Sequence, residues 1–375
     1  MERPASAPLS ITATAEHGAE PVVKPARFRL TPRAGLRILA AVAGLLLFVL
    51  ALEVIKAGAR GILPLITSLD VSGPANAVGF GWLLAYGALS GSPVAAIGVT
   101  LLAGGALTQD EAFAVVGGSR LGASFIVLAV GFALYLARRR SADGLYIGVV
   151  ALLTTFTTQA PAILLGLVSL RYGWLDRVSF ATPSGLLNVT DAVYSAPVDL
   201  IDGLLPGGLL FLVGVGVLLL SFLVFDRALP QLEGEAEGIS RALRSLSSRP
   251  LMFLLGGAVT LTTLSVSISL TALVPLSLKG YLKREHIIPY VMGANITTFI
   301  DTLVASVLLG GHSAFVVVLT EMLSVAVISI FLLVFLYRPY AKLILGGAHW
   351  TTASPRHLAI FLGAIVAAPL VLLFL

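Results

Sequence analysis

Long apolar stretches separated by short charged turns make up most of the chain after residue 37. Several of them are close to the roughly 20 residues that a helix needs to cross a lipid bilayer. The pattern therefore predicts an all-α polytopic membrane protein. The expected membrane spans are 38–55, 112–137, 145–170, 207–224, 287–309, 314–337 and 358–375.

Two further apolar stretches, 78–107 and 251–278, are interrupted in the middle. The sequence Gly91-Ser-Pro93 divides the first, and proline next to glycine interrupts a helix. The second contains the hydroxyl-rich sequence Thr260 to Thr271, with the break expected near 265–269. Each stretch is therefore predicted to form a re-entrant hairpin of two short helices.

Composition supports the membrane class and narrows the functions that fit. The chain is 57% hydrophobic and 11% charged, with a mean hydropathy of +0.99, whereas soluble domains carry about 25% charged residues. The absence of cysteine excludes disulfides and thiolate metal sites. There is no Walker loop, and the histidines lack metal-ligand spacing, so neither an enzyme nor a bound metal or cofactor is expected.

Charge places the ends of the spans relative to the membrane. The net charge of +5 is explained by basic residues that flank spans on the cytoplasmic side, so it implies no nucleic-acid partner. Arg27, Arg29, Arg33 and Arg37 precede the first span and predict a cytoplasmic N-terminus in the cell membrane. The clusters expected in the cytoplasm are 27–37, 138–140, 227–249, 279–284 and 338–342.

These features divide the chain into five parts. The acidic, Lys- and Arg-poor sequence 172–205 suits an external loop, and the Ala-, Pro- and Ser-rich start of the chain suits a disordered tail. The predicted parts are a cytoplasmic tail (1–34), a first membrane repeat (35–171), the external loop (172–205), a second membrane repeat (206–340) and a C-terminal transmembrane helix (341–375).

The two membrane parts are related by an internal repeat. An offset of 175 residues aligns 89–128 with 264–303 without a gap. The turn after the first hairpin lacks positive charge and the turn after the second is basic, so the hairpins are expected to open on opposite sides. Inverted repeats with broken helices bind substrate near the middle of the membrane. The informative matches are Ser90/Ser265, Ser92/Ser267, Gly105/Gly280 and Gly118/Gly293.

Polar groups lie inside the predicted spans. The sequence Gly293 to Asp301 places an Asn, two Thr and an Asp in an apolar segment, and the equivalent of Asn295 in the first repeat is Arg120. Such groups are costly in hydrocarbon and usually face a cavity or a partner. Gln159 and Glu321 are further polar residues within spans.

Four short motifs resemble those of the sodium–phosphate cotransporter family, whose two inverted repeats each carry a Gln-Ser-Ser-Ser hairpin and a Gly-Ala-Asn-Ile-Gly-Thr-Thr sequence. The resemblance covers about residues 40–337. Both glutamines are absent, Gly91 and Val266 replace serines, and Arg120 replaces the first asparagine, which makes the chain similar to a divergent member. The motifs are Leu89-Ser-Gly-Ser92, Leu264-Ser-Val-Ser267, Gly118-Ser-Arg-Leu-Gly-Ala-Ser124 and Gly293-Ala-Asn-Ile-Thr-Thr-Phe299.

The resemblance implies secondary-active transport of a small inorganic anion, phosphate first, by alternating access. The guanidinium fork of Arg120 suits a phosphate-like oxyanion, and sodium is the expected coupling ion. The lipid bilayer, the anion and Na⁺ are the expected partners, and an oligomer is compatible with the sequence. The expected substrate-binding residues are Ser90, Ser92, Arg120, Ser265, Ser267 and Ser269. The expected ion-binding residues are Asn295, Thr297, Thr298, Asp301 and Glu321.

Structural roles are the alternative for each of these residues. Hydroxyl groups in membrane helices often bond a carbonyl in the preceding turn or hold helices together. Arg120 could pair with Glu111, and both intramembrane carboxylates could be packing residues. Two other functions stay open: a proton-coupled carrier or exporter of another solute, with Asp301 or Glu321 as the proton site, and a non-transporting scaffold that kept the fold.

Overall fold

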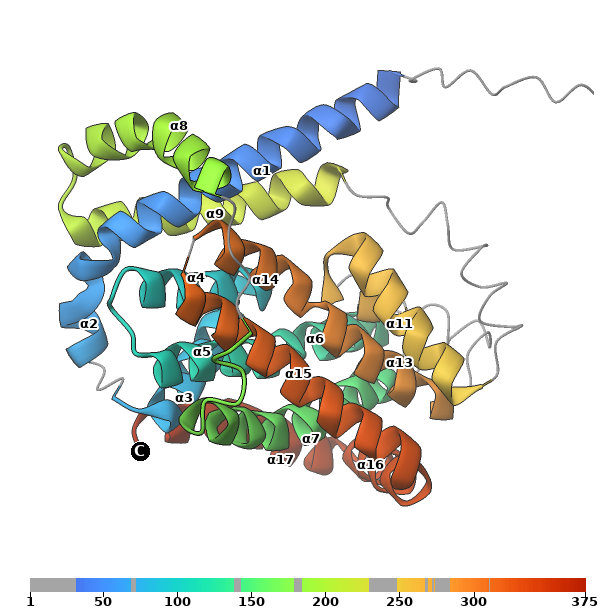
Figure 1. Ribbon diagram of the computed structural model, residues 1–375. Coiled ribbons are helices and arrows are strands. Elements are labelled where there is room, and N and C mark those ends of the chain that lie inside the picture. The colour runs from blue at the N-terminus through green and yellow to red at the C-terminus, as the bar shows by residue number, and fades with distance from the viewer. Residues whose placement is uncertain are drawn as a thin grey trace, which may run out of the picture.

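The computed structural model describes residues 32–68, 72–137, 143–178, 184–228, 248–266, 269–271, 273, 284–309 and 311–375. Every regular element in these residues is a helix (Figure 1). The helices are α1 (Pro32–Gly58), η1 (Ala59–Ile62), α2 (Leu63–Ser68), α3 (Pro74–Ala88), α4 (Ser92–Ala103), α5 (Gln109–Ala123), α6 (Phe125–Ala137), α7 (Asp143–Arg171), α8 (Ser184–Asp202), α9 (Gly207–Ala228), α11 (Arg249–Thr263), α13 (Arg284–Thr297), α14 (Phe299–Leu308), α15 (His312–Phe335), α16 (Tyr337–Thr352) and α17 (Pro355–Leu373).

Seven helical segments of the described chain are long and apolar enough to cross a membrane. Each of them coincides with one of the expected spans, so the prediction of an all-helical chain with several membrane-spanning segments is confirmed. The segments are Gly35–Ser68, Gln109–Phe132, Gly144–Arg171, Gly207–Phe225, Arg284–Leu308, His312–Phe335 and Pro355–Leu373.

Both interrupted stretches contain a helix break where the sequence predicts one. Helix α3 ends at Ala88 and is followed by Leu89, whose φ is +50°, and α4 begins at Ser92 with a proline in its first turn. Helix α11 ends at Leu264, whose φ is +47°. These are the only non-glycine residues with positive φ in the described chain, and they correspond under the offset of 175 residues. Such backbone conformations cost of order 1–3 kcal/mol each and persist only where the surrounding structure fixes them.

Helices α3 and α5 pack against each other in the same register as α11 and α13. A methyl group on Gly118 would lie 2.2 Å from the carbonyl oxygen of Val78, and one on Gly293 would lie 1.9 Å from that of Phe253. Glycine therefore lets the two backbones touch in both pairs. The offset of 175 residues also relates the close approaches of Gly81 to Val115 and of Gly256 to Tyr290.

Two of the expected straight spans are divided. The span 112–137 breaks at Ser124, between α5 and α6, and the span 287–309 breaks at Thr298, between α13 and α14. At the first break the Ser124 hydroxyl donates to the Leu121 carbonyl, and a hydroxyl that bonds the preceding turn bends a helix. At the second, the Thr298 hydroxyl accepts a hydrogen bond from Arg120. Hydropathy runs unchanged through both breaks, so the pattern of apolar positions does not reveal them.

The structure adds helices in two other regions. The region expected as an external loop contains α8, whose Tyr194 hydroxyl donates to the Leu46 carbonyl of α1. The region expected as one C-terminal helix contains the end of α16 and then α17. Helix α16 is amphipathic, with Ile344 buried and Lys342 exposed. With 16 residues, it is not among the helices long and apolar enough to cross a membrane.

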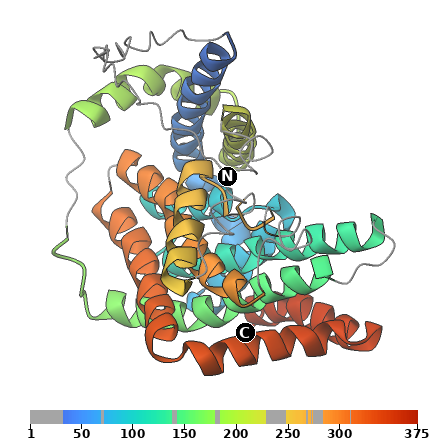
Figure 2. The same cartoon turned by 90° about the vertical axis from the view of Figure 1, so that its right-hand side faces the viewer.

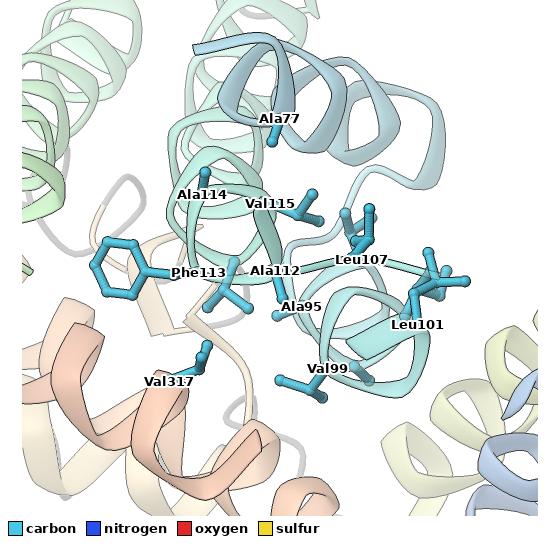
Figure 3. Close-up of a cluster of buried hydrophobic side chains, with 14 of the residues drawn as sticks. Ala77, Ala95, Val99, Leu101, Leu107, Ala112, Phe113, Ala114, Val115 and Val317 are labelled. Atoms are coloured by element: carbon cyan, nitrogen blue, oxygen red, sulfur yellow. The ribbon is translucent and has the colours of Figure 1, made fainter. Parts of the chain in front are cut away.

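Helices α1 and α9 form a pair that lies along one side of the bundle, at the top of Figures 1 and 2. They approach closely, because a methyl group on Gly58 would lie 2.5 Å from the Phe211 backbone nitrogen. Below the pair, α3, α4 and α5 share a core of small side chains such as Ala77, Ala95 and Ala112 (Figure 3). The fold thus consists of the α1–α9 pair packed over a larger body, which contains the α3–α4 break and the end of α11.

We expect Gly118→Ala to lower the Tm of the detergent-solubilised protein, because the added methyl group would press against the Val78 carbonyl. Overpacking of this kind costs about 1–3 kcal/mol. The matched control is Gly87→Ala on α3, where a methyl group meets nothing within 4 Å. This control should leave the Tm unchanged or raise it, because alanine favours a helix by up to about 1 kcal/mol. Equal effects of the two substitutions would contradict the backbone packing of α3 on α5.

Candidate functional site

The guanidinium group of Arg120 is the centre of a buried polar cluster. Arg120 lies in the last turn of α5 and is 4% exposed. Its Nη1 donates to the Thr298 hydroxyl at 2.9 Å, and its Nη2 donates to the Thr302 hydroxyl at 3.0 Å. Nη2 also lies 3.8 Å from Oδ1 of Asp301. One residue of α5 thus contacts three residues at or just after the α13–α14 break.

Asp301 and Thr302 complete this cluster. Oδ1 of Asp301 accepts hydrogen bonds from the backbone N–H of Thr302 at 2.5 Å and from its hydroxyl at 2.9 Å. The Thr302 hydroxyl therefore accepts from Arg120 and donates to Asp301. Oδ2 of Asp301 and Nε of Arg120 are buried and have no hydrogen-bond partner among the described residues. One acceptor and one donor thus stay available for a ligand or an ion.

Arg120 also contacts the break between α3 and α4. Its Nη1 lies 3.5 Å from the Ser92 hydroxyl, at the start of α4, and its guanidinium carbon lies 4.6 Å from the centre of the Phe299 ring. The ring stabilises the positive charge by a cation–π interaction. The expected alternative partner, Glu111, instead caps α5: its Oε2 accepts from the Thr108 backbone N–H at 2.9 Å.

A cavity of about 410 Å³ lies between the α3–α4 break and the end of α11. Ser90 and Ser92 line it from the α3–α4 break, and Leu264 and Ser265 line it from the end of α11. Side chains of α6 and α9 form the rest of its wall. Since one water molecule takes up about 30 Å³ of liquid volume, the cavity can hold a tetrahedral oxyanion and several waters.

The N-terminus of α4 gives this cavity a positive wall. Helix α4 has Gly91 at its N-cap and no side chain that caps its first turn. The N-terminus of a helix carries about half a positive charge and is a ready anion site. Ser92 and Pro93 of this turn line the cavity, and Arg120 lies behind Ser92. None of the residues that line the cavity carries a formal charge of its own, and the guanidinium group of Arg120 is shared with Asp301.

A second, smaller cavity of about 210 Å³ reaches Asp301. Its other walls are apolar and come from α1, α9 and α14. Phe222 of α9 and Leu264 line both cavities. The two cavities therefore lie next to each other under the α1–α9 pair, one with hydroxyl groups and the other with a carboxylate.

The structure gathers some of the expected site residues and separates others. Ser90, Ser92 and Ser265 line one cavity, and Arg120, Thr298 and Asp301 form one cluster beside it. The remaining residues have other partners. The Ser269 hydroxyl bonds the Tyr290 hydroxyl at 2.9 Å, Asn295 Nδ2 donates to the Thr155 hydroxyl at 3.0 Å, the Thr297 hydroxyl donates to the Gly257 carbonyl at 3.0 Å, and Ser267 lies outside the described residues.

Glu321 is separate from the Asp301 cluster and bonds a residue that the sequence singled out only weakly. Gln159 of α7 donates from Nε2 to Oε1 of Glu321 on α15. The sequence also missed Thr302, although a signal was present. Thr298 and Thr302 are four residues apart, a spacing that places two side chains on the same face of a helix.

No family model matches the chain, and comparisons with curated proteins and with solved structures found no significant match. The resemblance to sodium–phosphate cotransporters is carried by the motif residues of the sequence alone and stays a prediction.

We expect the buried pair of Arg120 and Asp301 to appear as a coupling energy in thermal unfolding. Arg120→Ala leaves a buried carboxylate without its cation and should cost about 3–5 kcal/mol. Adding Asp301→Asn should restore part of the lost stability, because the amide needs no counter-charge. We expect a coupling of at least about 1 kcal/mol. Combining Arg120→Ala with Glu53→Gln is the control, since Glu53 pairs with Lys56 at 3.7 Å instead. Additive effects of Arg120→Ala and Asp301→Asn would contradict the pairing.

Proposed function

We propose that the chain is a secondary-active membrane carrier of a small inorganic anion, with phosphate as the first candidate and a cation as the coupling ion. The observation that carries the proposal is the cavity at the two helix breaks, with Arg120 behind its hydroxyl-lined wall. The arrangement provides what an oxyanion needs: hydroxyl donors, a helix N-terminus and a nearby fixed positive charge.

The position of Arg120 supports an anion rather than a neutral substrate. Attraction between charges is several times stronger at a water-poor site than in bulk water. Arg120 is buried, its Nε has no hydrogen-bond partner in the part of the chain that the structure describes, and its Nη1 lies 3.5 Å from Ser92, which lines the cavity. A small rotation of the guanidinium group toward Ser92 would bring it to an anion in the cavity.

The buried charges support a coupling cation. The polar residues near the site include one base, Arg120, and two acids, Asp301 and Glu321. If all three are ionised, the group carries one net negative charge, and an unpaired buried charge is costly. One Na⁺ or one proton per cycle would balance it. Oδ2 of Asp301 is the acceptor available to Na⁺, a hard cation that prefers oxygen ligands.

The likeness of the two helix pairs supports a mechanism of alternating access. We infer that the pairs belong to inverted repeats whose hairpins re-enter the membrane from opposite sides, with the N-terminus in the cytoplasm of a cell membrane. The cavity lies between the breaks, where such carriers bind substrate. Rocking of one repeat against the other would open it to each side in turn.

A proton-coupled carrier of another solute is the second candidate. It is favoured by Glu321, whose hydrogen-bond partner is an uncharged amide. A proton-coupled carrier and a sodium-coupled carrier differ in the gradient that drives uptake. A scaffold that kept the fold would transport nothing under either gradient.

We expect proteoliposomes with the full chain to accumulate radiolabelled phosphate or a related oxyanion from a test panel when an inward sodium or proton gradient is imposed. Ser92→Ala should raise KM about tenfold, because a hydrogen bond to a charged ligand contributes about 1.5–3 kcal/mol. Arg120→Ala should abolish uptake. Thr100→Val is the matched control on α4, since the Thr100 hydroxyl bonds the Ala96 carbonyl and lies outside the cavity.

The outcomes separate the three functions. A folded Arg120→Ala protein that transports phosphate as well as the parent would end the anion assignment. Uptake of none of the solutes under any gradient would favour the scaffold. Arg120→Lys guards against misfolding of the alanine variant: it keeps the charge but loses the two-pronged geometry, so it should bind the anion more weakly while staying folded.

A further inference from the structure

Glu321 of α15 and Gln159 of α7 form a second buried polar site, which shares no hydrogen bond with the Asp301 cluster among the described residues. Glu321 is 0% exposed and Gln159 is 1% exposed. Gln159 Nε2 donates to Oε1 of the carboxyl, and Oε2 has no hydrogen-bond partner among the described residues. A methyl group on Gly117 of α5 would lie 2.9 Å from Oε1. The carboxyl therefore occupies a slot between α5, α7 and α15 that only a glycine at position 117 leaves open.

The surroundings of Glu321 contain little positive charge. Helix α15 packs against α4, α5, α7, α13, α14 and α16. Of the charged side chains on these helices, Arg120 of α5 is the one that attracts Glu321 electrostatically. Asp301 of α14 competes for the same guanidinium group, which lies 3.8 Å from its Oδ1. The other charged or titratable His, Asp, Glu, Lys and Arg residues of these helices, by position, are Asp110 and Glu111 in the first turn of α5, the first and last residues of α7 (Asp143 and Arg171), Arg284, Glu285 and His286 at the start of α13, His312 at the start of α15, and Arg338, Lys342 and His349 along α16.

An ionised Glu321 would be poorly compensated in this arrangement. A buried carboxylate costs several kcal/mol unless a cation or enough donors surround it. Glu321 has one amide donor and must share Arg120 with Asp301. A proton on Oε2 removes the charge. The slot is narrow, because even a methyl group on Gly117 would press against Ile163 and Glu321, so it leaves little space for a hydrated metal ion.

We propose that Glu321 is the proton-binding residue of the carrier and that Gln159 positions its carboxyl group. The inference rests on the proposed function and assigns the coupling cation to the proton. In the step itself, the carboxylate takes one proton from water on one side, an O–H bond forms at one carboxyl oxygen, and the same proton leaves to the other side. The amide of Gln159 suits both states, because its N–H donates to a carboxylate and its carbonyl accepts from a carboxyl O–H.

Arg120 connects this site to the anion cavity. Gly117, which contacts Glu321, and Arg120 lie one turn apart on α5. When Glu321 is ionised it draws on the positive charge of Arg120, and when it is protonated that charge is free to act on an anion behind Ser92. Proton and anion should therefore bind cooperatively, as a symporter of the two requires.

The test compares two assays on the parent and on Glu321→Gln in proteoliposomes. The first is exchange of labelled for unlabelled phosphate at equal pH on both sides, which needs the anion site but no net proton movement. The second is uphill uptake driven by an inward proton gradient. Glutamine has the size and neutrality of the protonated acid, so we expect the ratio of uphill uptake to exchange to fall at least tenfold below that of the parent.

Two further variants separate coupling from structure. Gln159→Leu should shift the pH at which exchange is half-maximal. Gln159→Asn should shift it less, because asparagine keeps an amide. A merely structural role would change the amount of folded protein without moving the pH profile. Thr320→Val is the control on α15: it removes a neighbouring buried hydroxyl that has no partner in the described chain and should leave both assays unchanged.

Several outcomes would overturn the inference. A parent that exchanges phosphate but accumulates it only under a sodium gradient would disprove the proton assignment and leave the anion carrier standing. Unimpaired uphill uptake by Glu321→Gln would do the same. If Glu321→Gln does not exchange, Glu321→Asp decides, since a shorter acid should move the pH profile and an unmoved profile rejects the role. A parent that moves none of the anions in the panel removes the proposed function and this inference with it.

Discussion

The contact of Arg120 with the α13–α14 break constrains the rest of the structure. A central arginine costs about 2.5–3.5 kcal/mol on membrane-insertion scales, so its burial requires partners of the right charge and geometry. Those partners are Thr298, Thr302 and Asp301, all from a helix far along the chain. Because the arginine must reach them, the end of α5 stays within side-chain reach of α14, and α4, which packs against both helices, is held beside the same cluster. The cavity at the helix breaks is a consequence of this requirement.

The glycine contacts set which parts of the molecule can move relative to one another. Where backbones touch, as at Gly118 and Gly293, sliding or tilting brings a side chain into a carbonyl group within a fraction of an ångström. The α3–α5 and α11–α13 pairs should each move as a unit for this reason. The cavities instead lie where α9 meets the α3–α4 break and the end of α11, through larger side chains such as Phe222 and Leu264. Any opening of the site is therefore easier at this boundary than within either pair.

The sequence predicts the features that depend on local composition and misses those that depend on distant partners. The spans are marked by long apolar stretches, and the break before Ser92 is marked by its glycine and proline. The break at Ser124 follows from one hydroxyl that bonds a carbonyl, a feature common to many unbroken helices. The partner of Asn295 is Thr155 of α7. Because a single sequence contains no record of which helices are neighbours, it could not show that this asparagine holds two helices together.

The degree of hydrogen bonding separates polar residues that join helices from those that can act on a solute. Asn295 and Thr297 each donate a hydrogen bond within the protein, whereas Asp301 and Glu321 each keep an oxygen that has no partner among the described residues. Buried polar groups are nearly always paired, so the unpaired ones call for an explanation. Here two acids share one arginine, and a single added positive charge would make the group of three neutral. A cation or proton that binds at one stage of a transport cycle and leaves at another would supply this charge and then remove it.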